Sequence, residues 1–248
     1  MASRLLITCD DCGLCEGINE AALRLFHEGL AHSASVMSNM PAAAHALALY
    51  RPFPAFNIGA HLNLTEGAAL TGVSALTDAE GRFLRIDHIR RLLHTSADFL
   101  SAAEAEFDAQ MAVFLGAGVQ PEHVTTHMHF HVVPALRDVV LRTARRYRAQ
   151  WVRAYRVRHT LMPRNWLARL PNRYEDGLLE YLAPVMYWVK TPPQALAQCI
   201  AAAGGSVEIV VHPDDAQDPT FPAHIRYPPA ARAAEVAYLR QVWQCFRE

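Results

Sequence analysis

Two adjacent aspartates and a set of histidines are the side chains of this 248-residue sequence with the clearest capacity for chemistry. The candidates are Asp10, Asp11, His61 and the alternating histidines His127, His129 and His131. One carboxylate and two imidazoles suit Zn²⁺, Mn²⁺, Fe²⁺ or Co²⁺, and suit Mg²⁺ less naturally. Three protein ligands leave coordination positions for water and substrate, so the pattern indicates a catalytic metal site rather than a closed structural one.

Arg153 and His212 add a guanidinium and another imidazole at the ends of two further apolar segments. Each candidate also has an ordinary structural explanation, and these alternatives stay open. An aspartate pair can cap a helix, a single histidine can belong to the core, and an arginine can form a surface ion pair. The stretch HMHFH could be a solvated cluster, but it lies inside an apolar segment, which favours metal binding.

The stretch CDDCGLC also holds Cys9, Cys12 and Cys15, a spacing that could serve part of an iron–sulfur cluster. Such a cluster usually takes four protein ligands, and the fourth would have to be Cys199 or Cys245. Because Cys9 ends a strand and Cys15 stands beside a helix start, a common centre is awkward. We therefore expect the thiols to behave as small buried hydrophobic groups and the carboxylates to carry the chemistry.

The elements that position these residues are predicted strands that alternate with predicted helices. The strands are expected at 4–8, 33–37, 56–64, 151–156 and 206–215, with 122–131 as a strand that runs into a loop. The helices are expected at 18–26, 41–50, 102–115, 134–148, from 193, and 230–246. This order indicates an α/β fold with parallel strands and crossover helices. We predict one domain, 1–248, forming an irregular (β/α) barrel of mostly parallel strands, with an open doubly wound sheet as the alternative. Because the carboxyl ends of parallel strands share one face, the candidate side chains should meet there.

Two regions interrupt the alternation. Residues 65–98 are rich in glycine and polar side chains, and DAEGRF (78–83) predicts a turn or hairpin. Residues 157–190 carry prolines and aromatic side chains among arginines. We expect this second region to be an inserted helical and aromatic segment that acts as a lid or an oligomerisation surface, with ordinary core packing as the alternative.

The composition is that of an ordinary globular protein, with 52% hydrophobic and 19% charged residues. The net charge of −1 gives no overall field that would attract nucleic acid or a membrane. The first residues do not predict a signal peptide, and no run approaches the roughly 18–20 apolar residues of a membrane span. Because five cysteines, an odd number, do not indicate a disulfide framework, we expect a cytoplasmic protein.

Four motifs resemble those of the YdjC-like carbohydrate deacetylases. CDDCGLCEGIN (9–19) is similar to the family's A-D-D-F-G-L-S-x-x-V-N, and GAHLNLTEG (59–67) to G-x-H-L-x-L-x-x-G. HMHFHVVP (127–134) is similar to H-x-H-x-H-x-x-P, and EIVVHP (208–213) to E-I-x-x-H-P. The stretches HFH and DAEGRF look closest to the hopanoid-biosynthesis-associated branch of this family.

The resemblance implies a fold like an irregular (β/α) barrel and a metal-dependent hydrolase that removes an N-acetyl group from an amino sugar. The sugar would belong to an oligosaccharide or a glycolipid. By position, Asp11, His61 and His127 would hold the metal ion, with His129 as an alternative ligand or an outer partner. The expected ion is Mg²⁺ or Zn²⁺, with Mn²⁺, Co²⁺ or Fe²⁺ as alternatives.

The same resemblance makes Asp10 the general base and His212 the acid that protonates the leaving amine. Arg153 would join the metal in stabilising the tetrahedral oxyanion. Departures from the family pattern are Cys12, Cys15 and Thr125, and the last stands where many relatives carry an aspartate.

Further expectations concern partners and competing functions. We expect a homodimer without nucleic acid, and contact with a membrane surface if the substrate is a glycolipid. The same Asp and His set could serve a metal-dependent phosphoesterase, although no glycine-rich phosphate cradle is present. A non-catalytic sugar-binding protein of the same fold is the other alternative.

Overall fold

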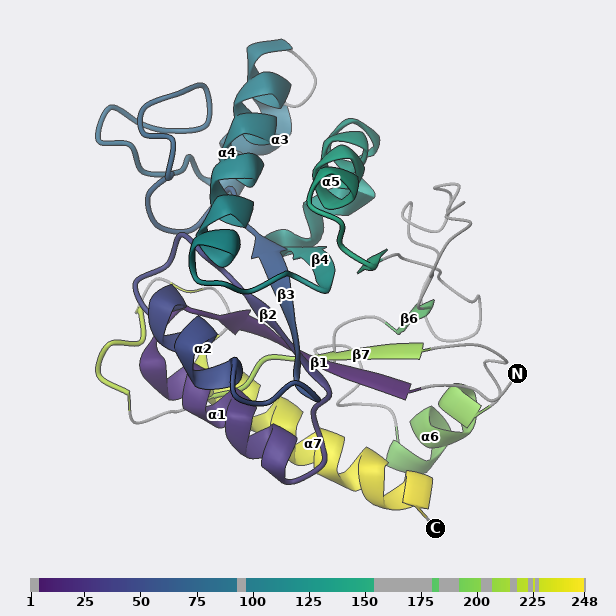
Figure 1. Cartoon of the computed structure of the whole chain (residues 1–248). Coiled ribbons are helices and arrows are strands. Elements are labelled where there is room, and N and C mark those ends of the chain that lie inside the picture. Colours follow the sequence, from purple (N-terminus) through teal and green to yellow (C-terminus); the bar gives the residue numbers. More distant parts are fainter. Residues whose placement is uncertain are drawn as a thin grey trace.

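A computed structural model of the chain describes residues 5–92, 97–153, 180–182, 192–201, 207–214, 218–222, 225 and 228–247. Seven parallel strands form one sheet in the order β5-β4-β3-β2-β1-β7-β6. Their bounds are β1 Leu5–Cys12, β2 Ser33–Val36, β3 Asn57–Leu62, β4 His123–Thr126, β5 Trp151–Val152, β6 Glu180–Leu182 and β7 Val207–Val211. The sheet curls into a half-barrel (Figure 1), which confirms the predicted α/β fold with an irregular barrel of parallel strands.

Helices cover this sheet on both sides. They are α1 Glu16–His27, α2 Ala43–Tyr50, α3 Ile86–Leu92, α4 Ala97–Gly116, α5 Pro134–Arg146, α6 Pro193–Ala201 and α7 Pro229–Arg247, with a 3₁₀ segment, η1, at His127–Val132. Figure 1 shows α1, α2 and α7 along one side of the strands and α4 and α5 beyond β3 and β4. Pro134 begins α5 at a position where its missing N–H has no intrahelical partner to lose.

The core lies between the central strands and the helices, and it explains two sequence features. Cys9 and Cys12 have no exposed surface and pack in the main hydrophobic cluster, which confirms the expectation that they act as small hydrophobic groups. Gly59 is needed where β3 passes the ring of His123, because a Cβ atom there would lie 2.2 Å from that imidazole. The close approach keeps β3 and β4 in the register that aligns His61 with Thr125.

Several boundaries differ from the sequence predictions. β1 extends beyond residue 8 to Cys12, so the aspartate pair lies within the end of the strand rather than after it. In the stretch 122–131, expected as a strand that runs into a loop, the strand ends at Thr126 and the 3₁₀ segment η1 follows, with left-handed backbone at Met128 and His129. The helix α3 was not predicted, whereas the expected turn at 78–83 is confirmed by antiparallel bridges that join Ala68 to Arg82 and Thr77 to Phe83.

Most of the 157–190 segment lies outside the described residues. Residues 180–182 of this segment form β6, which pairs with β7 at the edge of the sheet. Residues 154–156 of the predicted fifth strand also lie outside the description, and the described strand β5 ends at Val152. Within the ranges that the structure describes, no helix is long and apolar enough to cross a membrane.

Candidate active site

The end of β1 carries the two aspartates in opposite directions. The pairing register of β1 with β2 shifts between Cys9 and Cys12, and Asp11 has a left-handed backbone with φ of 64°. Aspartate tolerates this conformation better than most residues, but it is uncommon outside glycine and is often found at functional sites. The shift turns the carboxylates of Asp10 and Asp11 toward different partners.

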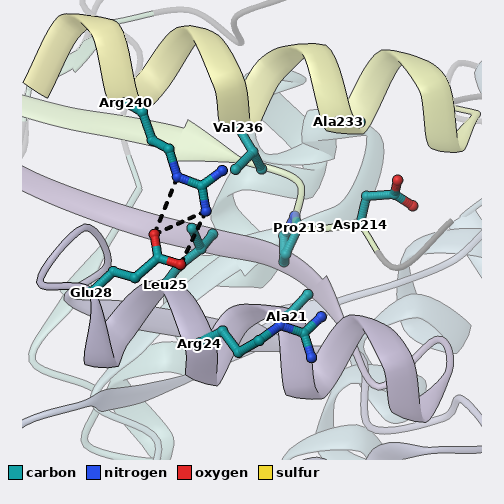
Figure 2. A pocket seen from close by; sticks show the side chains of 9 residues that line it. All are labelled: Ala21, Arg24, Leu25, Glu28, Pro213, Asp214, Ala233, Val236 and Arg240. Carbon is teal, nitrogen blue, oxygen red and sulfur yellow. Dashed lines mark hydrogen bonds and ion pairs between the residues drawn. The ribbon is translucent and has the colours of Figure 1, made fainter.

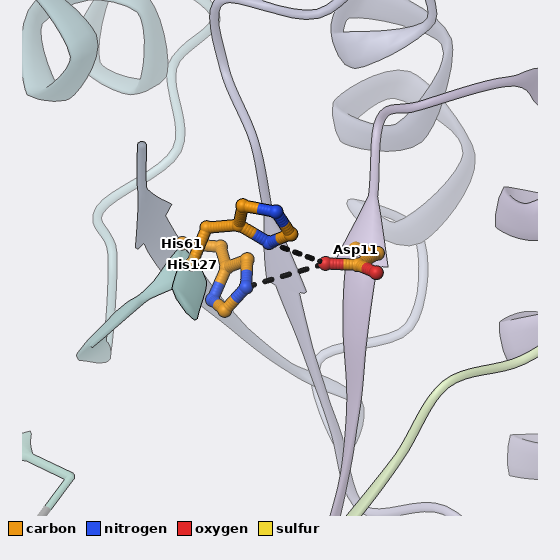
Figure 3. Close-up of side chains that lie close together, drawn as sticks. All are labelled: Asp11, His61 and His127. Carbon is orange, nitrogen blue, oxygen red and sulfur yellow. Dashed lines mark hydrogen bonds and ion pairs between the residues drawn. The ribbon is translucent and has the colours of Figure 1, made fainter. Parts of the chain in front are cut away.

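Asp11 meets two imidazoles from the neighbouring strands. One potential ligand atom from each of Asp11, His61 and His127 lies within 4.8 Å of the others. Asp11 Oδ1 is 2.9 Å from His127 Nδ1 and 3.4 Å from His61 Nε2 (Figure 3). Asp11 and His61 are buried, and His127 is partly exposed. This donor set can hold a divalent cation with one side open to solvent.

Each member of this group has an outer partner. Arg232 donates from its Nη2 to Asp11 Oδ2 at 2.6 Å. His61 Nδ1 lies 2.7 Å from Thr125 Oγ1. Because the Thr125 hydroxyl donates its hydrogen to the Ala60 carbonyl at 3.4 Å, it accepts from His61 Nδ1–H, which leaves the Nε2 lone pair facing Asp11.

His127 faces a carboxylate on its other nitrogen, because Glu66 Oε1 lies 3.9 Å from His127 Nε2. The loop after β3 holds Glu66 in place. Asn63 Oδ1 accepts from the backbone N–H groups of Thr65 and Glu66 at 2.9 and 3.1 Å, and Asn39 Nδ2 donates to the Glu66 carbonyl at 2.9 Å. These bonds fix the backbone of Glu66, and its carboxylate lies beside the partly exposed His127.

Asp10 is fixed by a buried network of charges. Arg153 donates from Nη1 and Nη2 to the two oxygens of Asp10 at 2.5 and 2.8 Å, and from Nε and Nη2 to Glu208 at 2.9 and 2.8 Å. Burial alone would raise the pKa of Asp10, but the Arg153 guanidinium outweighs it and holds that pKa well below its ordinary value. Asp10 is therefore ionised at neutral pH, with Oδ2 3.9 Å from His61 Nε2.

His212 follows β7 and is held by Glu235 of α7. Glu235 Oε2 accepts from the backbone N–H of His212 at 2.9 Å and lies 3.0 Å from its Nδ1. Burial would lower the pKa of His212, but the Glu235 carboxylate and its hydrogen bond raise it above the ordinary value. The pKa of Asp10 also responds to the charge of His212, so the two side chains share one electrostatic environment.

The buried charges around the site do not balance. The carboxylates of Asp10, Asp11, Glu208 and Glu235 and the guanidiniums of Arg153 and Arg232 are each at most 2% exposed. Four negative charges against two positive charges leave a formal charge of −2, or −1 when His212 carries a proton. Burial lowers the pKa of His61, so its ring adds no charge at neutral pH. The excess negative charge favours a bound cation.

The three thiols of CDDCGLC take no part in this cluster. Burial raises the pKa of Cys12 to about 12 and that of Cys15 to about 11, and it raises the pKa of Cys9 well above its ordinary value. These residues are therefore protonated thiols at neutral pH, whereas metal ligation requires thiolates.

Most of the residues selected from the sequence lie in this region. Asp11, His61 and His127 converge, Asp10 adjoins them, and Arg153 contacts Asp10 rather than the open side of the cluster. His129 is not a member of the ligand group found among the described residues.

The sequence reasoning missed Arg232, Glu235, Glu208 and Glu66. The sequence did contain a sign of Arg232 and Glu235, because these charged residues share one helix face with the apolar residues of α7 that are buried. Glu208 is likewise a charge in an otherwise apolar strand.

Fold and site define an α/β protein with a curled parallel sheet and a candidate metal centre at the carboxyl ends of its strands. Residues 4–243 match the family model described as YdjC-like protein, and the chain belongs to this family.

Curated relatives agree with this assignment, and a solved structure has a similar fold. A carbohydrate deacetylase of Brevibacillus brevis is 35% identical over 58% of this chain and 57% of its own length. A carbohydrate deacetylase of Halalkalibacterium halodurans is 28% identical over 85% of this chain and 84% of its own. The crystal structure of an Enterococcus faecalis V583 protein, proposed to cleave cellobiose-phosphate, superimposes with a TM-score of 0.81. That match covers 100% of this chain and 95% of that protein. Its identity is 21%, so it supports the fold alone.

Proposed function

We propose that this protein is a metal-dependent carbohydrate deacetylase that removes an N-acetyl group from an amino sugar. The single observation that carries the proposal is the convergence of Asp11, His61 and His127 from three separate segments onto one centre. Membership of the YdjC-like family and the names of the curated relatives support deacetylation of a carbohydrate.

The residues present fit a divalent cation. One carboxylate oxygen and two neutral imidazole nitrogens form the donor set, and the buried charges leave an excess of at least one negative charge. We assign Zn²⁺ or Mg²⁺ to the site, with Mn²⁺, Co²⁺ or Fe²⁺ as alternatives. A bound cation of this kind supplies Lewis acidity and lowers the pKa of a coordinated water.

We assign the proton transfers to Asp10 and His212. Asp10 is ionised, is adjacent to the cluster, and can accept a proton from the attacking water. Because Nδ1 of His212 faces Glu235, its Nε2 can deliver a proton to the departing amine, and the raised pKa of His212 favours the protonated ring.

We assign a positioning function to Arg153 in addition to its expected help with the oxyanion. Its guanidinium is 1% exposed and donates four hydrogen bonds to Asp10 and Glu208. Such bidentate pairing fixes the plane of the Asp10 carboxylate.

The finer predictions keep their status as proposals. They are the glycolipid or hopanoid-type substrate, the homodimer, the cytoplasmic location, membrane-surface contact, the lid or oligomerisation segment at 157–190, and His129 as an alternative ligand or an outer partner. The acidic Glu66 beside His127 suits a neutral sugar or an amino sugar.

Acetate release from a panel of N-acetylated oligosaccharides and glycolipids tests the proposal. Asp11→Ala, His61→Ala and His127→Ala should each lose bound metal and turnover, whereas Asp10→Ala should keep the metal and lose turnover. Elemental analysis of the purified variants reads the metal directly. Phosphate release from sugar phosphates without acetate release would replace this function by a phosphoesterase, and bound metal without any turnover would indicate a sugar-binding protein.

A further inference from the structure

Arg232 engages one of the two oxygens of the carboxylate in the candidate metal group. Its Nη2 donates to Asp11 Oδ2 at 2.6 Å, and both side chains are buried. The other oxygen, Oδ1, faces His127 Nδ1 at 2.9 Å and His61 Nε2 at 3.4 Å. In Figure 3 both dashed lines end on this same oxygen, and the second oxygen is turned away from the imidazoles.

The guanidinium is itself held from several sides. Arg232 comes from α7, has no exposed surface, and donates from Nη1 to the Pro213 carbonyl at 3.5 Å. Its central carbon lies 5.4 Å from the centre of the Phe221 ring, within the range of a cation–π contact. A side chain anchored in this way cannot follow Asp11 if the carboxylate rotates. The left-handed backbone of Asp11 also restricts where its carboxylate can go.

We propose that Arg232 is a positioning residue that restricts Asp11 to one ligating oxygen and so keeps a coordination position open for water and the acyl group. This inference rests on the proposed function. A carboxylate can bind a cation through one oxygen or through both. The charge-assisted bond from Arg232 to Oδ2 opposes binding of the cation through both oxygens, because Oδ2 would have to leave the guanidinium to reach the cation.

Loss of Arg232 should change the metal affinity in the direction opposite to that expected for an ordinary outer partner. An outer partner that only orients a ligand supports affinity, and its loss typically weakens metal binding by about 10- to 100-fold. Loss of Arg232 should do the opposite. It frees Oδ2 for the cation and removes a positive charge beside the site, and both changes favour the bound metal.

The test is a titration of the full-length protein with Mn²⁺, followed by electron paramagnetic resonance, with water-proton relaxation as a measure of exchangeable bound water. Arg232→Met should bind Mn²⁺ at least about tenfold more tightly than the wild type and should lose water relaxation at the bound ion. Acetate release should fall by at least about tenfold. Arg232→Lys keeps a positive donor and should bind Mn²⁺ within about threefold of the wild type.

Arg240→Met is the matched control on the same helix. Arg240 pairs with Glu28 at the end of α1 at 2.9 and 3.0 Å in a surface pocket between α1 and α7 (Figure 2), and its side chain is 49% exposed. This variant should change neither Mn²⁺ affinity nor turnover.

Weaker or unchanged Mn²⁺ binding by folded Arg232→Met would overturn the inference. If thermal unfolding shows that Arg232→Met does not fold, Arg232→Lys decides, and a loss of affinity of tenfold or more in that variant overturns it. If the wild type binds Mn²⁺ and releases acetate but the Arg232 variants do not show the expected Mn²⁺ affinities, only the inference about Arg232 is wrong. A wild-type protein that binds no divalent cation sinks the proposed function itself.

Discussion

At the residue scale, the orientation of His61 depends on a neutral hydroxyl. Metal-binding histidines commonly donate their second N–H to a carboxylate or a backbone carbonyl. Here Thr125 Oγ1 accepts that hydrogen bond at 2.7 Å, and its own hydroxyl donates a hydrogen bond to the Ala60 carbonyl. A hydroxyl adds no charge, so it fixes the ring without further increasing the excess negative charge of the site. Thr125 is thus a weaker orienting group for His61 than a carboxylate would be.

We expect Thr125→Val to weaken metal binding by about 10- to 100-fold, because His61 loses its acceptor and its neutral tautomer is no longer fixed. Thr125→Ser keeps the hydroxyl and should bind metal nearly as the wild type does. Isothermal titration of both variants with Zn²⁺ measures the difference. Equal affinities for Val and Ser at this position would show that the hydroxyl has no part in holding the ring.

At the residue scale we also predict which thiols of the folded protein react with an alkylating reagent. Burial raises the pKa values of Cys9, Cys12 and Cys15, so the folded protein should not expose reactive thiolates there. Cys245 is partly exposed near the end of α7 and should react. Iodoacetamide labelling at pH 8, followed by peptide mass spectrometry, should modify Cys245 in the native state and the other three only after unfolding. Rapid native modification of Cys12 would contradict the packing described for β1.

Single residues also define what the sequence could predict. Parallel strands bring their carboxyl ends to one face, and this rule placed the aspartate pair, His61 and the histidines of HMHFH together without coordinates. The family resemblance then selected Asp11, His61 and His127 among them. Arg232 was not found, since its contact with Asp11 spans 221 positions and depends on how α7 packs. Its charge on a buried helix face was the only trace of that contact in the sequence.

At the element scale, the same limit applies to β1. The polar pair at residues 10 and 11 suggested that the strand ends at residue 8, yet pairing with β7 continues to Cys9 and pairing with β2 resumes at Cys12. Buried aspartates inside a strand are tolerable because Arg153 and Arg232 compensate them from distant elements. The local sequence pattern predicted the order and type of most elements. It could not predict the end of β1, because the arginines that compensate the buried aspartates come from distant parts of the chain.

The helix α7 contributes two buried charges, and the second controls a proton. Glu235 raises the pKa of His212, so the protonated form required of a general acid persists to higher pH than that of an ordinary histidine. Glu235→Gln removes the negative partner, the pKa of His212 falls, and the alkaline limb of the kcat profile should move to lower pH. The pH dependence of acetate release measures this shift.

Asp214→Asn, close to His212 in the chain, is a control that leaves the Glu235 contact in place. An alkaline limb that stays fixed in Glu235→Gln, with a lower rate at every pH, would mean that His212 is not the acid. Loss of folding is excluded by comparing the thermal unfolding of the variant with that of the wild type.

At the scale of the whole molecule, the candidate metal group joins parts of the chain that are distant in sequence. Its three residues come from β1, β3 and the start of η1, and Arg232, which holds Asp11, comes from α7. Two of these elements, β1 and β3, are strands of the curled sheet, and α7 packs beside it (Figure 1). A ligand that binds the folded arrangement and not the unfolded chain stabilises the whole fold by mass action. The excess negative charge at the site adds to this effect, because repulsion between buried carboxylates opposes folding until a cation is bound.

We therefore expect the thermal midpoint to depend on divalent metal. At a free concentration of 100 times Kd the gain is about 2.7 kcal/mol, which corresponds to roughly 5–10 °C for a chain of this size. Scanning calorimetry of chelator-treated protein, with and without added Zn²⁺ or Mg²⁺, measures the shift. His61→Ala and His127→Ala should show no metal-dependent gain, while Arg240→Met should show the full gain. A midpoint that ignores metal in the wild type, at concentrations that saturate binding, would mean that the cation does not bind preferentially to this folded arrangement. The three side chains would then have to be explained by packing and hydrogen bonding alone.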